Sequence, residues 1–166
     1  GLGDVYKRQE EALARQVKYA LRRCEGEFKV TWRDGRIYVD ALTEFDYEET
    51  IDNLKTVFGV SSICPVVRRE DEGFEKLAQE LVDYVDKVYE DKNLTFKVQT
   101  RRARKNYPMN SMELNMELGG AVLDAFPEMK VDVHKPQVML HVEIREKIYI
   151  YSVEIPGPGG MPVGSN

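Results

Sequence analysis

The sequence predicts an α+β (or α/β) protein built from two mixed units in which helices pack on small sheets. Two observations support this fold class. Apolar residues recur at helical spacing in some segments and alternate with polar residues in others, and Gly, Pro and Asp-Gly signals separate these segments. The chain has 166 residues, 42% of them hydrophobic and 32% charged. These values fit a globular protein with one ordinary domain or two small ones, and no apolar stretch approaches the roughly 20 residues that cross a membrane.

The first elements are a helix and a β-hairpin. Residues 1–9 show neither helical nor strand periodicity and are expected to be a non-native segment. Apolar residues then repeat at helical spacing over 10–24, and Gly26 ends this helix. Residues 28–39 alternate on either side of Asp34-Gly35. This dipeptide tolerates the positive φ angles of a tight turn and therefore predicts a hairpin.

A second helix and one more strand complete the first unit. Helical spacing runs over 47–58 and stops at Gly59. The apolar segment 60–67 predicts a strand, which Pro65 restricts to a sheet edge. The order helix, strand, strand, helix, strand is that of a ferredoxin-like domain over residues 10–68 that lacks its first strand. A sheet without that strand would expose an edge and favour association.

The second unit is predicted over residues 69–155. Asn110 is placed to cap a helix, with Glu113 three residues later reaching back to it. Pro and Gly dominate residues 156–166, which is the composition of a linker. The other elements follow the same two periodicities: a helix over 74–89, a strand over 95–100, and a hairpin of strands over 138–144 and 148–153.

Charge is unevenly distributed along the chain. The net charge is -5, which by itself argues mildly against a nucleic-acid partner. Acidic residues crowd the segments 44–49, 70–75 and 80–91, whereas residues 92–112 contain six basic residues and no acid. A positive field confined to one face can attract a nucleic acid whatever the total charge is.

The sequence contains no catalytic constellation. His134 and His141 lack the cysteine or carboxylate pattern of a metal site. Cys24 and Cys64 fit no zinc or redox spacing, and we expect both to be buried thiols of a cytoplasmic protein. The glycine-rich tail lacks the Lys-Ser/Thr of a phosphate-binding P-loop. We therefore expect no catalytic residue, no metal and no cofactor in this chain.

The basic run at residues 101–105 is the main candidate for binding. Arginines between a strand and a capped helix can donate forked hydrogen bonds to phosphate oxygens. Free amides at the start of the helix after Asn110 would add an anion site. Tyr107 could stack on an unpaired base, or it could pack inside its loop. The alternative for the whole run is a solvated loop that only keeps the protein soluble.

Several segments resemble the N-terminal part of the tRNA 4-thiouridine sulfurtransferase (ThiI) family. The residues Arg101 to Glu113, with the sequence RRARKNYPMNSME, resemble the central motif of THUMP domains in that family. The other matching segments are Arg36-Ile-Tyr-Val39, Val57-Phe-Gly-Val60, Val131 to Pro136 with the strand after it, and the tail from Ile155 to Ser165. Arg104 stands where the family has an acidic or small polar residue.

This resemblance implies a ferredoxin-like domain followed by a THUMP domain, which together hold a tRNA by the 3′ end of its acceptor stem. In the family a later domain uses ATP and Mg²⁺ to adenylate a uridine, and sulfur from a cysteine desulfurase replaces the oxygen. The product is 4-thiouridine, and the same sulfur serves thiamine thiazole synthesis. Residues 156–166 would then begin the linker to that catalytic domain, and this chain is expected to bind and not to catalyse.

The resemblance also implies a set of RNA-binding residues. The basic residues contact phosphates, Asn110 and Ser111 hold the terminal nucleotides, and His134 and Lys135 lie beside them. The full set is Arg101, Arg102, Arg104, Lys105, Asn106, Tyr107, Asn110, Ser111, His134 and Lys135. Two alternatives remain: the THUMP module of another RNA-modifying enzyme such as a methyltransferase, or a scaffold or homodimerisation module that does not bind RNA.

Overall fold

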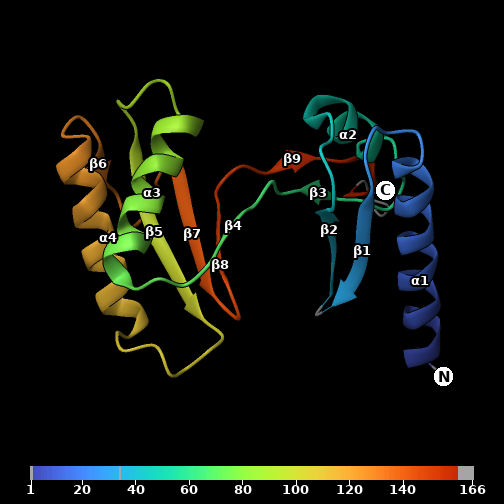
Figure 1. Cartoon of the computed structure of the whole chain (residues 1–166), viewed down its shortest axis with the longest axis horizontal. Helices are drawn as coiled ribbons and strands as arrows, with labels where there is room; N and C mark the ends of the chain where they lie inside the picture. Colours follow the sequence, from blue (N-terminus) through green and yellow to red (C-terminus); the bar gives the residue numbers. More distant parts are fainter. Residues whose placement is uncertain (1, 34, 161–166) are drawn as a thin grey trace. The chain divides into compact units, whose positions relative to one another are not determined.

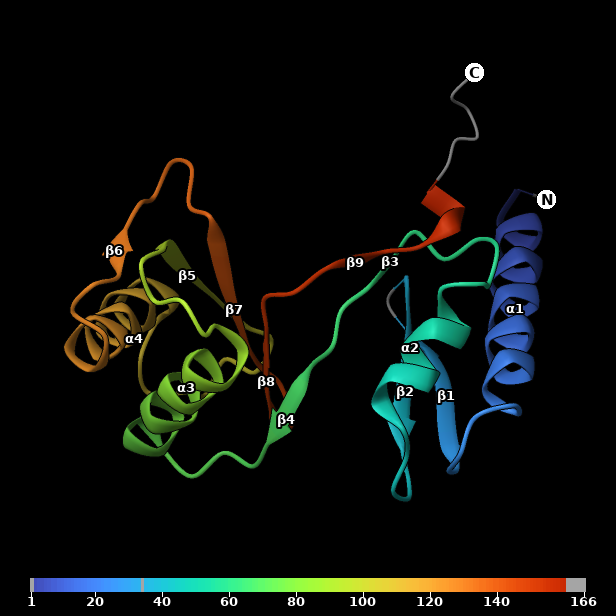
Figure 2. The same ribbon diagram turned by 90° about the horizontal axis from the view of Figure 1, so that it is seen from above.

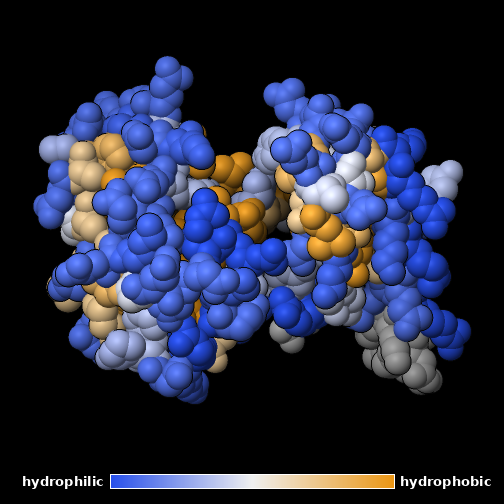
Figure 3. Space-filling view, in the orientation of Figure 1, coloured by the Kyte–Doolittle hydropathy of each residue, from blue (hydrophilic) through white to orange (hydrophobic). Residues whose placement is uncertain are grey.

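The computed structural model describes residues 2–33 and 35–160 (Figures 1 and 2). The chain divides into two compact units, one formed by Gly1–Ile63 with Glu154–Asn166 and the other by Cys64–Val153. Each unit combines helices with a sheet, so the predicted mixed α and β architecture is confirmed. No helix among the described residues is long and apolar enough to cross a membrane. Hydrophilic side chains dominate the face of each unit that is seen in Figure 3.

The first unit has the predicted order of helix, strand, strand, helix and strand. Its hairpin pairs Phe28 with Ala41 at one end and Arg33 with Arg36 at the other, and Gly35 adopts a positive φ of 76° at the turn. The elements are α1 (Leu2–Leu21), β1 (Phe28–Arg33), β2 (Arg36–Ala41), α2 (Tyr47–Leu54) and β3 (Ser62–Ile63), followed much later by β9 (Ile155–Pro156) and the 3₁₀ turn η1 (Pro158–Gly160).

Helix α1 is longer than its apolar periodicity predicts. It begins at Leu2, eight residues before the start that the pattern at Glu10 indicates. Adding residues to a helix that has already nucleated requires no apolar stripe, so periodicity misses such an extension. The apolar stripe of α1 builds the core of this unit, where Val17, Ala20 and Leu21 pack with Leu54 and Val57.

The strand predicted over 60–67 is wrong as a single element. Residues Ser62–Ile63 form β3 in the first unit, and Val67–Arg69 form β4 in the second. Pro65 lies between them and has no N–H to donate to a ladder, which explains the interruption. The sequence also places the domain boundary after residue 68, whereas the two units of the structure divide after Ile63.

The tail that the sequence indicates as a linker is folded onto the first unit as far as residue 160. Strand β9 pairs antiparallel with β3. The Gly157 amide donates to the Ser61 carbonyl at 2.9 Å, and the Gly159 amide donates to the Val60 carbonyl at 2.8 Å. A Cβ on Gly159 would lie 2.1 Å from the backbone carbon of Gly59. The glycine-rich composition therefore permits a close backbone approach here, and residues 161–166 lie outside the described part.

The second unit is a five-stranded sheet with two helices on one face (Figures 1 and 2). The sheet order is β4-β8-β7-β5-β6, in which β5 runs parallel to β6 and β7 while β8 is antiparallel to β7 and β4. The elements are β4 (Val67–Arg69), α3 (Phe74–Val88), β5 (Thr95–Arg102), α4 (Ser111–Ala125), β6 (Lys130–Val131), β7 (Val138–Ile144) and β8 (Ile148–Tyr151). All were predicted from the sequence except β4 and the two-residue β6.

Buried and exposed residues alternate along β5, and this alternation decides from which face of the sheet its basic residues project. Phe96, Val98 and Thr100 are buried on the face that the helices cover, where Leu114 and Leu118 of α4 join the same core. Each large apolar side chain buried there contributes about 1.5–3 kcal/mol. Because neighbouring residues of a strand point to opposite faces, Arg101 projects from the face of the sheet that α3 and α4 leave open.

Candidate nucleic-acid interface

The basic run of the sequence forms the end of β5 and the loop that leads into α4. Arg101, Lys105 and Asn106 have exposed side chains, and Arg102 and Arg104 are half-buried. We call residues 103–110 the basic loop. Its two ends are fixed by a strand and a helix that share one core, so the exposed cations are held on a rigid framework.

Arg102 points into the basic loop. Its Nη1 donates to the carbonyls of Lys105 at 3.5 Å and Tyr107 at 3.3 Å. Its Nε is buried and has no hydrogen-bond partner among the described residues. The structure therefore gives Arg102 a part in shaping the loop, and the two carbonyls occupy Nη1, so the phosphate contact expected of it would fall to Nη2.

Arg104 is also engaged within the protein. Its Nε donates to the Arg145 carbonyl at 2.9 Å, its Nη1 to Asn106 Oδ1 at 3.4 Å, and its Nη2 forms an ion pair with Asp71. This guanidinium holds the pKa of Asp71 below its usual value, with help from the Gly73 amide. Arg104 thus links the basic loop to the segment before α3, where it is paired with the Asp71 carboxylate.

The position of Tyr107 decides between the two roles considered for it, stacking on an unpaired base and packing inside its loop. Only 6% of its surface is exposed, and it packs in the main core of the second unit. Its hydroxyl has no partner among the described residues, and burial, reinforced by the nearby Asp71 carboxylate, raises the pKa of the phenol. The expected stacking role of Tyr107 is therefore corrected, because a ring buried in the core has no face to offer a base.

The start of α4 carries the predicted cap. Asn110 Oδ1 accepts from the Glu113 amide at 2.8 Å, and Glu113 Oε1 accepts from the Asn110 amide at 3.3 Å. The capping box is confirmed, but it occupies the Asn110 side chain and one first-turn amide. The amides of Ser111 and Met112 precede the first intrahelical bond of α4, from the Leu114 amide to the Asn110 carbonyl, and lie at the positive end of the helix dipole, which favours an anion.

His134 and Lys135 do not lie beside the basic loop. They occupy the turn between β6 and β7, and β6 pairs with Thr95 and Phe96 at the start of β5. The basic loop follows the other end of β5, about 23 Å away at 3.3 Å per residue. Figure 1 shows the two loops at opposite ends of the sheet, one yellow and one orange. The expected grouping is therefore wrong, because a right-handed crossover between parallel strands returns the chain to its starting end.

The turn at His134 is held locally. Asp132 Oδ1 accepts from the amides of His134 at 2.9 Å and Lys135 at 3.0 Å. These two amides, that of Lys135 first, lower the pKa of the Asp132 carboxyl. The side chains of His134 and Lys135 are exposed. They form a turn beside the Asp132 carboxylate that is separate from the basic loop.

Two methionines near the basic loop were not identified from the sequence. Met112 and Met116 are 76% and 68% exposed and lie one helical turn apart on α4. Leu114, Leu118 and Val122 fill the buried stripe of the helix. The signal was present in the sequence, because the two methionines fall outside that stripe at a spacing of four residues. They place an apolar surface directly beside Ser111.

The histidines and cysteines of the described residues are not part of a metal-ligating cluster. No group of three or more His, Cys, Asp or Glu residues there could hold a metal ion. His141 stacks on Tyr151 with ring centroids 4.7 Å apart. Cys24 is buried as expected, whereas Cys64 is exposed, against expectation, because it lies on the segment that joins the two units.

Two family models match the chain. The model described as the ThiI ferredoxin-like domain matches residues 3–64, and the model described as the THUMP domain matches residues 72–153. The chain is 64% identical over 157 residues to a probable tRNA sulfurtransferase of Lachnospira eligens and 54% identical over 156 residues to one of Agathobacter rectalis. These alignments cover 94% of this chain but only 40% of each relative.

Two solved structures also match nearly the whole of this chain. The chain superposes on a 4-thiouridine synthetase, solved as an RNA complex with bound ATP, with a TM-score of 0.74 and 29% identity. That match covers 95% of this chain and 39% of the other. The protein PH1313 from Pyrococcus horikoshii Ot3 matches with a TM-score of 0.71 and 29% identity, over 93% of this chain and 50% of the other.

Proposed function

The chain belongs to the ThiI ferredoxin-like family over residues 3–64 and to the THUMP family over residues 72–153, and from this premise we propose that it binds tRNA. The observation that carries the proposal is the group of basic side chains between the end of β5 and the start of α4. Arg101 is exposed at the end of the strand, and Lys105 is exposed on the basic loop, which Arg102 and Arg104 hold in shape. Exposed cations on a preorganised loop lose little entropy when they bind phosphate.

The surface around α4 suits an unpaired 3′ end. The amides of Ser111 and Met112 favour a phosphate group. The exposed side chains of Met112 and Met116 offer an apolar surface on which unstacked bases can rest, since thioethers adapt to flat rings. Phosphate binding beside an apolar surface is the combination by which proteins hold single-stranded RNA. We assign the terminal nucleotides to this region, and we leave His134 and Lys135 out of it.

The whole protein is proposed to be a cytoplasmic tRNA sulfurtransferase that makes 4-thiouridine. The chain spans about 40% of the length of the relatives that it matches. Activation of the uridine with ATP and Mg²⁺, and sulfur supply by a cysteine desulfurase, would both fall to the remainder of that protein. The part described here would supply binding and orientation.

A binding titration tests this proposal. The chain is titrated with a tRNA that keeps its unpaired 3′ end and with the same tRNA trimmed of that end, each at two salt concentrations. We expect salt-sensitive binding, because cation–phosphate contacts release counterions. We also expect the trimmed tRNA to bind at least about fivefold more weakly, since each stacked base contributes about 1–3 kcal/mol. Equal affinities for the two RNAs would contradict recognition of the 3′ end.

A further inference from the structure

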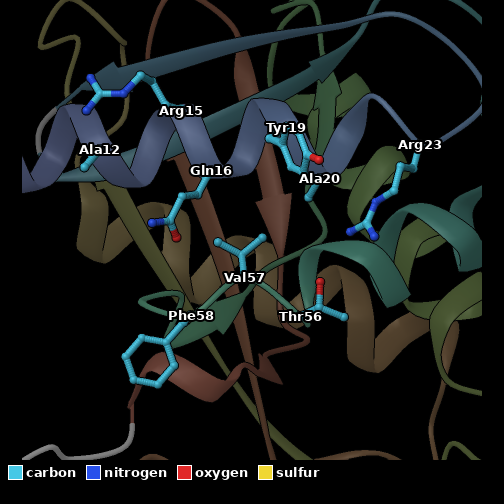
Figure 4. Close-up of a pocket in the computed structure, with 9 residues that line it drawn as sticks. All are labelled: Ala12, Arg15, Gln16, Tyr19, Ala20, Arg23, Thr56, Val57 and Phe58. Atoms are coloured by element: carbon cyan, nitrogen blue, oxygen red, sulfur yellow. The ribbon is translucent and has the colours of Figure 1, made fainter.

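We propose that the first unit carries a second RNA-binding site, an open hollow between α1 and the segment Thr56–Phe58 that accepts an unpaired nucleotide. The hollow encloses about 570 Å³ and is shown in Figure 4. This inference rests on the proposed tRNA binding and places a further contact outside the THUMP domain. The residues that line it are Ala12, Arg15, Gln16, Tyr19, Ala20, Arg23, Thr56, Val57 and Phe58.

One wall of the hollow is a face of α1. Arg15 and Tyr19 lie four residues apart, which places them in one row along the helix, and Arg23 follows in the turn after the end of α1 at Leu21. The adjacent row contains the small residues Ala12 and Ala20, whose short side chains leave the space open. Gln16 extends from the helix, and Arg23 from the turn after it, toward the side of the opposite segment (Figure 4).

The other wall presents an aromatic ring whose exposure is unusual. Phe58 is 72% exposed, although its neighbour Val57 is 5% exposed and belongs to the core. The sequence predicts Phe58 on the buried stripe of a helix, but α2 ends at Leu54. The side chain therefore lies in solvent, where it forgoes about 1.5–3 kcal/mol of burial. Tyr19, on the facing helix, is 66% exposed.

The segment that carries Phe58 is fixed on both sides. The Val57 amide donates to the Leu54 carbonyl and the Val60 amide to the Val57 carbonyl, each at 3.2 Å. Gly59 has a positive φ of 105°, and a Cβ there would meet Leu13 of α1 at 3.0 Å. On its other side Gly159 approaches the Gly59 backbone. The backbone that carries the ring is thus held in place on both sides, which reduces the entropy lost when the segment binds a ligand.

The chemistry of the lining favours a nucleotide. The two charged residues that line the hollow are arginines, and no acid lines it. No ion pair involving Arg15 or Arg23 is found in the part of the chain that the structure describes. A guanidinium can hold a phosphate while an aromatic ring stacks on the attached base. An acidic peptide would use the arginines alone and would leave two exposed rings without a role.

The test compares single substitutions in the whole chain. Phe58→Ala is expected to weaken binding of tRNA roughly five- to a hundredfold, the range for losing one stacked base, without changing the salt dependence. Arg23→Ala is expected to weaken binding and to lower the slope of log K against log salt by about 0.7. Tyr47→Ala, which removes another exposed ring of the same unit, is the matched control and should leave the affinity within about twofold.

The outcomes separate this inference from the proposed function. The substituted side chains are exposed, so the thermal unfolding temperature should stay unchanged and report an intact fold. Trimming the tRNA 3′ end should add to the effect of Phe58→Ala, because the two contacts are independent. If the parent chain binds tRNA and neither Phe58→Ala nor Arg23→Ala weakens that binding, the second site is overturned and the THUMP proposal stands. If the parent chain binds no tRNA, both fall.

Discussion

Replacing Tyr107 by alanine is expected to lower the free energy of unfolding of the second unit by about 3–5 kcal/mol, the usual effect of truncating a buried aromatic residue. The ring is buried in the core that joins β5 to α4, and its carbonyl accepts from Arg102. Truncation leaves a cavity beneath the basic loop and loosens the loop as well. Urea unfolding followed by circular dichroism measures the change.

Phenylalanine at the same position provides the control. The Tyr107 hydroxyl is buried without a partner among the described residues, and removing an unsatisfied buried polar atom costs little or stabilises. Tyr107→Phe should therefore keep the parent stability and the parent affinity for tRNA. A Phe variant as unstable as the Ala variant would show that the hydroxyl makes an essential interaction, and the packing account of this loop would be wrong.

Replacing Arg101 and Lys105 together by alanine is expected to weaken tRNA binding roughly ten- to a hundredfold at moderate salt, because solvent screens exposed charges and each contact then contributes less than the roughly 1.5–3 kcal/mol of a fully formed charged hydrogen bond. Both side chains are exposed, so the stability of the unit should hardly change. If each cation neutralises one phosphate, the slope of log K against log salt should fall by about 1.4–1.8. Filter binding at several salt concentrations gives both quantities.

A matched variant removes the same charge from the opposite end of the sheet. Lys130 and Lys135 are exposed near the turn between β6 and β7, and replacing both by alanine changes the net charge equally. This variant should retain the parent salt slope, because long-range attraction alone is largely screened at physiological salt. An equal loss of slope in the two double variants would mean that the RNA does not dock at the basic loop.

Elements with a strong periodicity could be predicted from the sequence. The hairpin around Asp34-Gly35, the capping box of Asn110 and Glu113, and the helix over 74–89 are all present with small changes in their ends. In these cases the local pattern and the tertiary environment favour the same structure. The fold class followed from them because each element buries one face only.

Elements that depend on distant partners could not be predicted. Strand β9 exists because β3 lies open to it and because Gly157 and Gly159 allow the backbones to meet. Composition alone describes such a tail as a linker. The end of α2 at Leu54 was missed for a similar reason, since Val57 reaches the core from a turn and not from a helix.

The sequence indicates the position of the candidate site along the chain but not the arrangement of its side chains in space. A run of basic residues shows where positive charge is concentrated. It does not show which of these side chains form hydrogen bonds or ion pairs within the protein. Arg104 is engaged by Asp71, which is 33 residues away, and Arg102 by its own loop. His134 was grouped with the loop because of a family motif, and strand direction separates the two.

Backbone amide NMR of the labelled chain, titrated with a short RNA stem that carries an unpaired 3′ end, tests most directly where the tRNA end is bound. The account predicts the largest shift changes at Arg101, Lys105, Ser111, Met112 and Met116, with small changes at His134 and Lys135. Shift changes concentrated at the turn between β6 and β7, with the basic loop unaffected, would contradict it.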